Sequence, residues 1–387
     1  YFYEKYNKIL VNFIISFSLI FLIFIFNDVN KRKNHLDTIS LKKNLSLNKR
    51  QVVWFILDEY DPEYINYEKY GLKLNHIKDL MNKSFTHKNS FSPSNSTLHS
   101  VPSILMKTYT KGSKIVDYEL NIIDTDNNNI KFEYKNTLFS KIYNNDFNFK
   151  IISEVLPYCS MLKLSSNCNE FSNRNNYFLD GIKKTFIPEG YIYKISKLFS
   201  NKEKFDLNKI NKINKFDNRN ILLSSKLNIN FNDLEKLLNE NINLIFFHLF
   251  IPHTKTITSD YIKKNFNNTF TKNDNEEYFL NLKFTDIIID NIFSKIEKNK
   301  KKDILLILSS DHWRRVRSPD KAQPALLLMK IKSDNSKVEI LNQNSNIYIY
   351  DVIEKYLSKK VNFHNDIKLI FEDSKNFNPE KTYLWKK

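Results

Sequence analysis

The chain has 387 residues, which is long enough for one large α/β domain with additional segments. Its formal net charge is +17, from 60 Lys and Arg against 43 Asp and Glu. The basic residues are scattered, and an abundance of Lys and Asn with only 4 Gly indicates a general compositional bias rather than a basic binding patch. With no nucleic-acid-binding signature and no C-x-x-C pair, the sequence argues against nucleic-acid-binding and zinc-finger proteins.

Residues 9–26 form an apolar run without charge, ILVNFIISFSLIFLIFIF, which is long enough to span a bilayer as a helix. A cleaved signal peptide is the alternative, but the run is long for one and no small-residue cleavage site follows it. We therefore predict a flanking segment over residues 1–8, a transmembrane helix over residues 9–28, a linker over residues 29–50 and a folded domain over residues 51–387.

The charges beside the apolar run leave its orientation open. Three cations follow the run and two precede it, so the positive-inside rule favours a cytoplasmic folded domain; they are Lys31, Arg32 and Lys33 against Lys5 and Lys8. The sequence starts at Tyr1 rather than Met, and we expect a missing N-terminal part whose spans could override this rule.

Beyond the linker, buried strands alternate with amphipathic helices. In chain order we predict a strand over 51–57, helical structure over 62–82, a loop over 85–96, helices over 98–106 and 137–143, a strand over 147–153, a helix over 231–239, a strand over 242–250, a helix over 277–298, strands over 303–308 and 325–332 and a helix over 349–357. Residues 160–230 show no clear pattern. This alternation predicts an α/β fold with a mostly parallel central sheet and helices on both faces.

Three of the predicted strands end in residues that can bind a metal ion or move a proton. Asp58 follows the first, His253 follows the strand over 242–250, and Asp311 with His312 follows the strand over 303–308. Sites in such sheets lie beyond the carboxyl ends of the strands, and carboxylate with imidazole suits a divalent transition metal. Separately, Asp58 could be only a helix N-cap and His253 only a loop residue; their convergence favours a site. His248, inside a strand, fits the core.

A hydroxyl group precedes the predicted helix over 98–106. Such a hydroxyl can meet a phosphate held by helix N–H groups, and a nearby metal ion can activate it as a nucleophile. Ser96 and Thr97 are the candidates. For both residues a simple N-cap role is the other interpretation.

The order of these motifs resembles the alkaline phosphatase and sulfatase superfamily. The matching features are a strand ending in Asp58, a hydroxyl leading a helix, Ile-Pro-His ending at His253, and Ser-Asp-His ending at His312, which together cover roughly residues 51–335. The sequence is most similar to sulfatase-like membrane proteins such as lipoteichoic acid synthases and phosphoethanolamine transferases. In these families a glycine ends the helix ten residues after the nucleophile, which selects Thr97 and places Lys107 where the glycine is expected.

The resemblance implies roles for these residues. Asp58, Thr97, Asp311 and His312 would bind one divalent metal ion, which could be zinc, manganese, magnesium or calcium. His253 would contact the transferring group, as general acid or substrate ligand, or bind a second metal. Arg314, in the Trp-Arg-Arg segment after His312, would bind a substrate anion, with a solvated loop as the alternative.

The resemblance further implies phosphoryl rather than sulfuryl chemistry. Sulfatases convert a Cys or Ser of a C/S-x-P-x-R motif to an aldehyde, whereas Ser100-Val-Pro-Ser-Ile lacks the Arg and a Thr nucleophile cannot be converted. We expect a phosphotransferase or phosphodiesterase acting on a phosphorylated lipid or an envelope glycan, at the cell membrane and with the catalytic domain outside the cytoplasm. A sulfuric ester hydrolase and a non-catalytic, glycan-binding relative are the alternatives.

An exported domain would lie in an oxidising compartment. There, the nine-residue separation of Cys159 and Cys168 would allow a small disulfide-closed loop, and two unpaired thiols are the alternative.

Overall fold

The computed structural model describes residues 49–116, 119–164, 166–170, 231–253, 274–316 and 321–374. The strands are β1 (Arg50–Asp58), β2 (Phe85–His87), β3 (Ser90–Phe91), β4 (Thr110–Val116), β5 (Glu119–Asp124), β6 (Asn129–Lys131), β7 (Phe149–Ser153), β8 (Cys168–Glu170), β9 (Leu244–Pro252), β10 (Asp303–Ser310), β11 (Leu327–Ile331), β12 (Val338–Ile340) and β13 (Asn344–Ser345). The α-helices are α2 (Tyr67–Tyr70), α3 (Asn75–Met81), α4 (Thr97–Met106), α5 (Leu138–Asn144), α6 (Tyr158–Met161), α11 (Phe231–Asn239), α13 (Asp274–Lys298), α14 (Ile349–Leu357) and α15 (His364–Glu372). The 3₁₀ turns are η1 (Pro62–Ile65), η2 (Tyr134–Asn136) and η3 (Asn346–Tyr348).

The centre of the molecule is an eight-stranded sheet with the order β12-β2-β11-β10-β1-β9-β7-β8. β10, β1, β9, β7 and β8 are parallel neighbours, and β11 pairs antiparallel with both β10 and β2. The prediction of a mostly parallel α/β sheet is confirmed.

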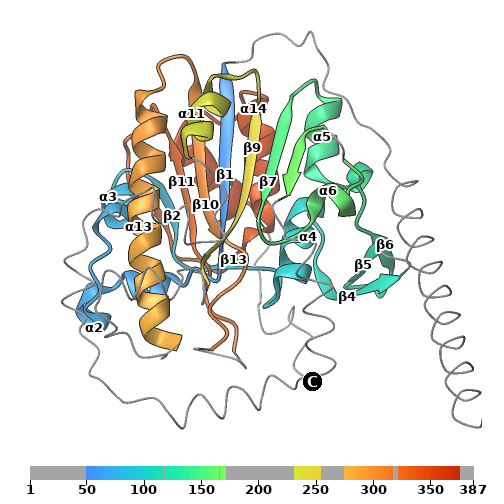
Figure 1. Cartoon of the computed structure of the whole chain (residues 1–387), viewed down its shortest axis with the longest axis horizontal. Helices are drawn as coiled ribbons and strands as arrows, with labels where there is room; N and C mark the ends of the chain where they lie inside the picture. Colours follow the sequence, from blue (N-terminus) through green and yellow to red (C-terminus); the bar gives the residue numbers. More distant parts are fainter. Residues whose placement is uncertain are drawn as a thin grey trace, which may run out of the picture.

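Helices cover both faces of this sheet (Figure 1). On one face, Val53, Phe55 and Leu57 of β1 pack in one core cluster with α3, α11 and α13. On the other face, Val52, Trp54 and Ile56 pack in a second cluster with α4, α5, α6, α14 and α15. Alternate residues of a strand point to opposite faces, so a strand buried on both sides reads as the continuous apolar run seen at residues 51–57.

Most helices and strands predicted for the described residues are present in the structure, and some differ from the prediction. The helical segment expected over 62–82 is divided into η1, α2 and α3, because Asp61 and Pro62 begin a separate turn and Gly71 adopts a positive φ of 69° after α2. The prediction of a loop over 85–96 is wrong in part, because β2 and β3 lie within it and pair with other strands. The sheet formed by β4, β5 and β6, and the helix α15, were not predicted. The β4–β5–β6 sheet is antiparallel and packs beside α4 (Figure 1).

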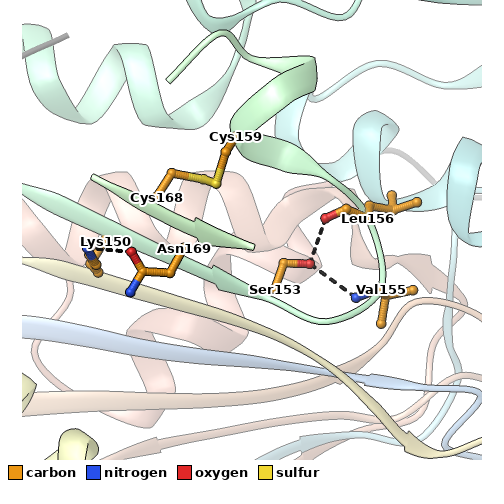
Figure 2. Close-up of a disulfide and its surroundings, with 7 residues drawn as sticks. All are labelled: Lys150, Ser153, Val155, Leu156, Cys159, Cys168 and Asn169. Atoms are coloured by element: carbon orange, nitrogen blue, oxygen red, sulfur yellow. Dashed lines mark hydrogen bonds between the residues drawn. A yellow bond between two sulfur atoms is a disulfide. The ribbon is translucent and has the colours of Figure 1, made fainter. Parts of the chain in front are cut away.

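A disulfide joins Cys159 of α6 to Cys168 of β8, with a Cα–Cα distance of 5.4 Å (Figure 2). This agrees with the disulfide-closed loop considered from the sequence. The turn between β7 and α6 is held by Ser153, whose hydroxyl accepts a hydrogen bond from the Val155 N–H at 3.3 Å and donates to the Leu156 carbonyl at 2.8 Å. Both bonds fix the start of α6 relative to the sheet.

Among the residues that the structure describes, no helix has the length and apolarity needed to cross a membrane. The predicted span over residues 9–28 lies outside the described residues, as do residues 171–230 of the segment without a clear pattern.

Candidate metal centre and active site

Two neighbouring parallel strands deliver carboxylates to the same edge of the sheet. β1 and β10 pair continuously up to Leu57 opposite Ser310, so Asp58 and Asp311 follow at the same level. The register of the pairing between β1 and β9 shifts between Leu57 and Asp58. An irregularity of this kind changes the direction of side chains and is common next to active sites. The structure therefore brings Asp58 and Asp311 together at the carboxyl edge, where sites of parallel sheets lie.

Asp58, Asp311 and His312 form a cluster that could hold a metal ion. One ligand atom from each residue lies within 4.8 Å of the others, and all three side chains are buried. The cluster joins Asp58 to Asp311 and His312, which lie more than 250 positions later in the chain. It is the one such group of three or more acidic, His or Cys residues found within the described residues.

Thr97 begins α4 and points its hydroxyl at the same cluster. Its Oγ1 donates a hydrogen bond to Asp311 Oδ2 at 2.6 Å and lies 3.3 Å from His312 Nε2. Ser96 is the N-cap residue, and its side chain makes no capping hydrogen bond. Ser100, one turn into α4, donates to the Asp311 carbonyl and ties the helix to the end of β10.

The ring of His312 is oriented for metal binding. Its Nδ1 lies 2.9 Å from the Trp313 carbonyl, which can only accept, so Nδ1 carries the proton in the neutral ring. The lone pair of Nε2 then faces Asp311 Oδ2 at 3.2 Å. Two electron-rich atoms this close to each other and to Thr97 Oγ1 suit a cation between them.

The electrostatics of the cluster also fit a bound cation. Burial raises the pKa of Asp58 well above its ordinary value, and the Asp311 and Glu59 carboxylates raise it further, while Arg315 opposes them. Burial also acts to raise the pKa of Asp311, but the positive charge of His312 and His248 in their protonated forms and the Thr97 hydrogen bond outweigh it and lower that pKa. A divalent ion would neutralise this crowded negative charge, and the oxygen and nitrogen donor set suits zinc or manganese.

Glu59, directly after Asp58, is a part of the site that was not selected from the sequence. Its backbone has a φ of 60°, which is uncommon for a residue with a side chain. Its N–H donates to Asp311 Oδ1 at 3.0 Å, and its carbonyl accepts from the Tyr278 hydroxyl at 2.7 Å. This backbone conformation allows one residue to bind both Asp311 and α13. An unusual conformation of this kind is visible only in the tertiary structure.

His253 lies at the edge of this group rather than inside it. It follows the cis peptide bond between Ile251 and Pro252, and its Nε2 lies 4.0 Å from Glu59 Oε2. Asn281 of α13 donates to the His253 carbonyl at 2.7 Å. The side chain of His253 is 26% exposed, so it can be approached from solvent.

The two arginines after Trp313 have different positions. Arg314 is buried, with its guanidinium 4.0 Å from the centre of the Tyr278 ring and its Nη1 3.2 Å from the Tyr64 hydroxyl. Arg315 is 46% exposed and contacts the Glu59 carboxylate. The cation that faces the site is therefore Arg315, whereas Arg314, the residue selected from the sequence, packs on aromatic rings.

His248 is buried, as expected for a core residue, but it makes a specific contact behind the metal centre. The Tyr158 hydroxyl lies 2.8 Å from its Nδ1, and burial lowers the pKa of His248 to about 4, so the ring is neutral near pH 7. Its Nε2 has no hydrogen-bond partner among the described residues. In the sequence, the only sign of this contact was a histidine inside an apolar strand. Histidines of an ordinary core have the same pattern, so the contact could not be predicted from it.

Comparisons with known proteins concern the fold. No protein-family model matches the sequence, and no curated protein matches it. The structure is similar to the phosphonate monoester hydrolase of Agrobacterium radiobacter, with a TM-score of 0.50 and 9% identity over 80% of this chain and 74% of that one.

Two further solved structures have lower scores. A protein of the alkaline phosphatase superfamily from Vibrio parahaemolyticus matches with a TM-score of 0.46 and 10% identity, over 84% of this chain and 73% of that one. The lipoteichoic acid synthase LtaP from Listeria monocytogenes matches with a TM-score of 0.48 and 10% identity, over 86% and 78%. The mixed, mostly parallel sheet and the similarity to the phosphonate monoester hydrolase show that the chain shares the fold of that structure.

Proposed function

We propose that this protein is a metal-dependent phosphoryl-group transferase or hydrolase that uses Thr97 as its nucleophile. The position of the Thr97 hydroxyl, 2.6 Å from Asp311 and 3.3 Å from His312 Nε2, carries the proposal. An ordinary N-cap hydroxyl would instead accept a hydrogen bond from its own helix. The Thr97 hydroxyl is directed at metal-binding side chains, where a nucleophile of this class is needed.

The proposed metal ligands are Asp58, Thr97, Asp311 and His312. A divalent ion held by them would lower the pKa of the Thr97 hydroxyl and reduce negative charge on the phosphoryl oxygens. Asp311 Oδ2 accepts the hydrogen bond of that hydroxyl and orients it before attack.

The reaction then has two steps. Thr97 gives its proton to Asp311 as its Oγ1 forms a bond to phosphorus and the bond to the leaving alcohol breaks, and His253, at the open edge of the site, donates a proton to that alcohol. Water or an acceptor hydroxyl next attacks the phosphorus and gives its proton to His253, while the bond to Thr97 breaks and Thr97 Oγ1 regains its proton from Asp311. Transfer to an alcohol and hydrolysis differ only in this acceptor.

The substrate class follows from the family resemblance and from the predicted span over residues 9–28. We propose a phosphodiester donor, such as a lipid headgroup, with an envelope glycan or lipid as acceptor, at the membrane and outside the cytoplasm. The disulfide between Cys159 and Cys168 supports an oxidising compartment. A threonine nucleophile disfavours sulfuric ester hydrolysis, because the sulfatase aldehyde cannot form from it.

The structure also bears on the non-catalytic alternative. The substitution of Lys107 for the expected glycine was the sequence feature that suggested it. Lys107 adopts the left-handed conformation that a glycine would adopt, with φ 52° and ψ 44°, so α4 still ends there and still begins at Thr97. Lys107 in place of glycine therefore does not disturb the site, and it gives no support to a non-catalytic relative.

Metal analysis and turnover of the full chain test the proposal. We expect about one divalent ion per chain and hydrolysis of bis(p-nitrophenyl) phosphate, with Thr97→Ala lowering kcat at least about 100-fold because the nucleophile is removed. Ser96→Ala is the matched control and should retain activity. A Thr97→Ala protein as active as the wild type, or an equal loss in Ser96→Ala, would refute the assignment of Thr97.

A further inference from the structure

Arg315 is held beside the metal centre by only one edge of its guanidinium. Its Nε and Nη2 both lie 2.9 Å from Glu59 Oε1. These atoms form the side edge of the group, so the end edge, with one proton each of Nη1 and Nη2, is not used in this contact. The side chain of Arg315 is 46% exposed, so its guanidinium can be approached from solvent.

Glu59 determines the position of the Arg315 guanidinium. Its carboxylate is only 7% exposed, and its Oε1 lies 4.0 Å from His312 Nδ1 while its Oε2 lies 4.0 Å from His253 Nε2. The backbone N–H of the same residue is bonded to Asp311. Glu59 therefore joins Arg315 to the presumed metal ligands and to the presumed proton donor.

Several carboxyl groups lie beside this cation. Asp58, Glu59 and Asp311 place three carboxyl groups at one edge of the sheet, and any that stays ionised repels an anionic substrate. The guanidinium of Arg314 packs on the Tyr278 ring, whereas Arg315 contacts Glu59 of this group. Guanidinium groups bind phosphate oxygens through two parallel hydrogen bonds, for which the end edge of Arg315 has the geometry.

We propose that Arg315 binds an anionic phosphate oxygen of the substrate at the rim of the metal centre, with Glu59 as the positioning residue that holds its guanidinium. This inference rests on the proposed phosphoryl-transfer function and adds a residue that selects for anionic substrates.

Calorimetric titration of the metal-loaded full chain with inorganic phosphate tests this role without turnover. Arg315→Gln should weaken phosphate affinity about tenfold or more, because a charge-assisted hydrogen bond is lost. Arg315→Lys should restore affinity only in part, since an ammonium group cannot form the paired contact. In turnover, Arg315→Gln should raise KM for the phosphodiester more than it lowers kcat. Metal content should be unchanged in both variants.

A double variant separates direct binding from simple charge neutralisation. If Arg315 only neutralises Glu59, Glu59→Gln with Arg315→Gln will recover wild-type phosphate affinity, which would overturn the inference. If Arg315 contacts the phosphate, the double variant stays as weak as Arg315→Gln. Lys131→Gln, which removes another cation paired with a glutamate, Glu119 at 2.7 Å in the β4–β5–β6 sheet, is the matched control and should change nothing.

The two proposals fail in different ways. A wild-type protein that turns over substrate, with phosphate affinity and KM unchanged in Arg315→Gln, would refute the inference and leave the function intact. A wild-type protein that binds phosphate through Arg315 but shows no turnover would refute the function and leave the anion site.

Discussion

Lys107 shows how a single residue can keep a required turn at an energetic cost. Its φ of 52° and ψ of 44° place it in the left-handed region, where its N–H bonds to the Ile104 and Ser103 carbonyls and closes α4. A residue with a Cβ is less stable there than glycine by roughly 1 kcal/mol. The ion pair between Lys107 Nζ and Asp351 Oδ1, at 2.6 Å, offsets part of that difference.

Replacing Lys107 by glycine should therefore stabilise the protein once the ion pair is removed. In an Asp351→Asn background, we expect Lys107→Gly to raise the free energy of unfolding by about 0.5 to 1 kcal/mol, measured by urea denaturation. Lys107→Ala in the same background is the control and should give no gain, because alanine keeps the Cβ. Equal effects of glycine and alanine would show that backbone strain is not the cause.

At the scale of elements, α3 is held by a carboxylate from another helix. Its N-cap residue, Leu74, has no side-chain acceptor, so the first N–H groups of α3 need partners from elsewhere. Asp286 of α13 accepts from the Ile77 N–H at 2.9 Å and the His76 N–H at 3.5 Å. Burial raises the pKa of Asp286, and the hydrogen bond from Ile77 opposes this shift. A negative charge at a helix N-terminus is favourable, so Asp286 fastens α3 to α13.

Removing this charge should loosen α3 in particular. We expect Asp286→Asn to lower the free energy of unfolding by about 1 to 3 kcal/mol, since buried N–H groups lose a charged acceptor. Hydrogen exchange should increase most over residues 75–81. Asp290→Asn, one turn along α13, is the control: Asp290 is 49% exposed and pairs with His76 at 3.3 Å, so its removal should change stability by less than about 0.5 kcal/mol. Similar losses in both variants would contradict the capping role.

At the scale of the whole molecule, the candidate metal centre joins β1, β10 and α4 at the carboxyl edge of the sheet. Burial favours metal binding at this centre, but without a metal ion it leaves charged carboxylates away from water, which destabilises the fold. Asp58 and Asp311 are 3% and 0% exposed, and two buried carboxylates side by side repel each other. A bound divalent ion would convert this repulsion into a link between the three elements, so metal should contribute strongly to stability.

Metal removal should therefore reverse the order of stability of two proteins. With zinc or manganese bound, we expect a higher Tm for the wild type than for Asp58→Asn, because the variant has lost a ligand. In EDTA at pH 7.5 we expect the variant to have the higher Tm, because one buried charge is gone. Scanning calorimetry with and without metal measures this. A wild-type Tm that does not respond to EDTA would argue against a metal centre, and Asp290→Asn should show the wild-type response.

The sequence by itself determined the parts of this protein that follow from periodicity. Strands buried on both faces appear as continuous apolar runs, so β1, β9 and β10 were predictable within a few residues, and so was the parallel arrangement of their carboxyl ends. That arrangement alone brought Asp58 and Asp311 to one edge. The direction of β11 and the β4–β5–β6 sheet could not be predicted, because short strands have weak patterns and their pairing depends on distant partners.

Only the tertiary structure decided which side chains face the site. Thr97 rather than Ser96 meets Asp311, because the orientation of a side chain at a helix start depends on how the whole helix packs. Arg315 rather than Arg314 reaches the open side, because Tyr64 and Tyr278 from two other elements form the aromatic pocket that takes up Arg314. Local sequence sets the residue types near a site, whereas the direction in which each one points is set by contacts between segments far apart in the chain.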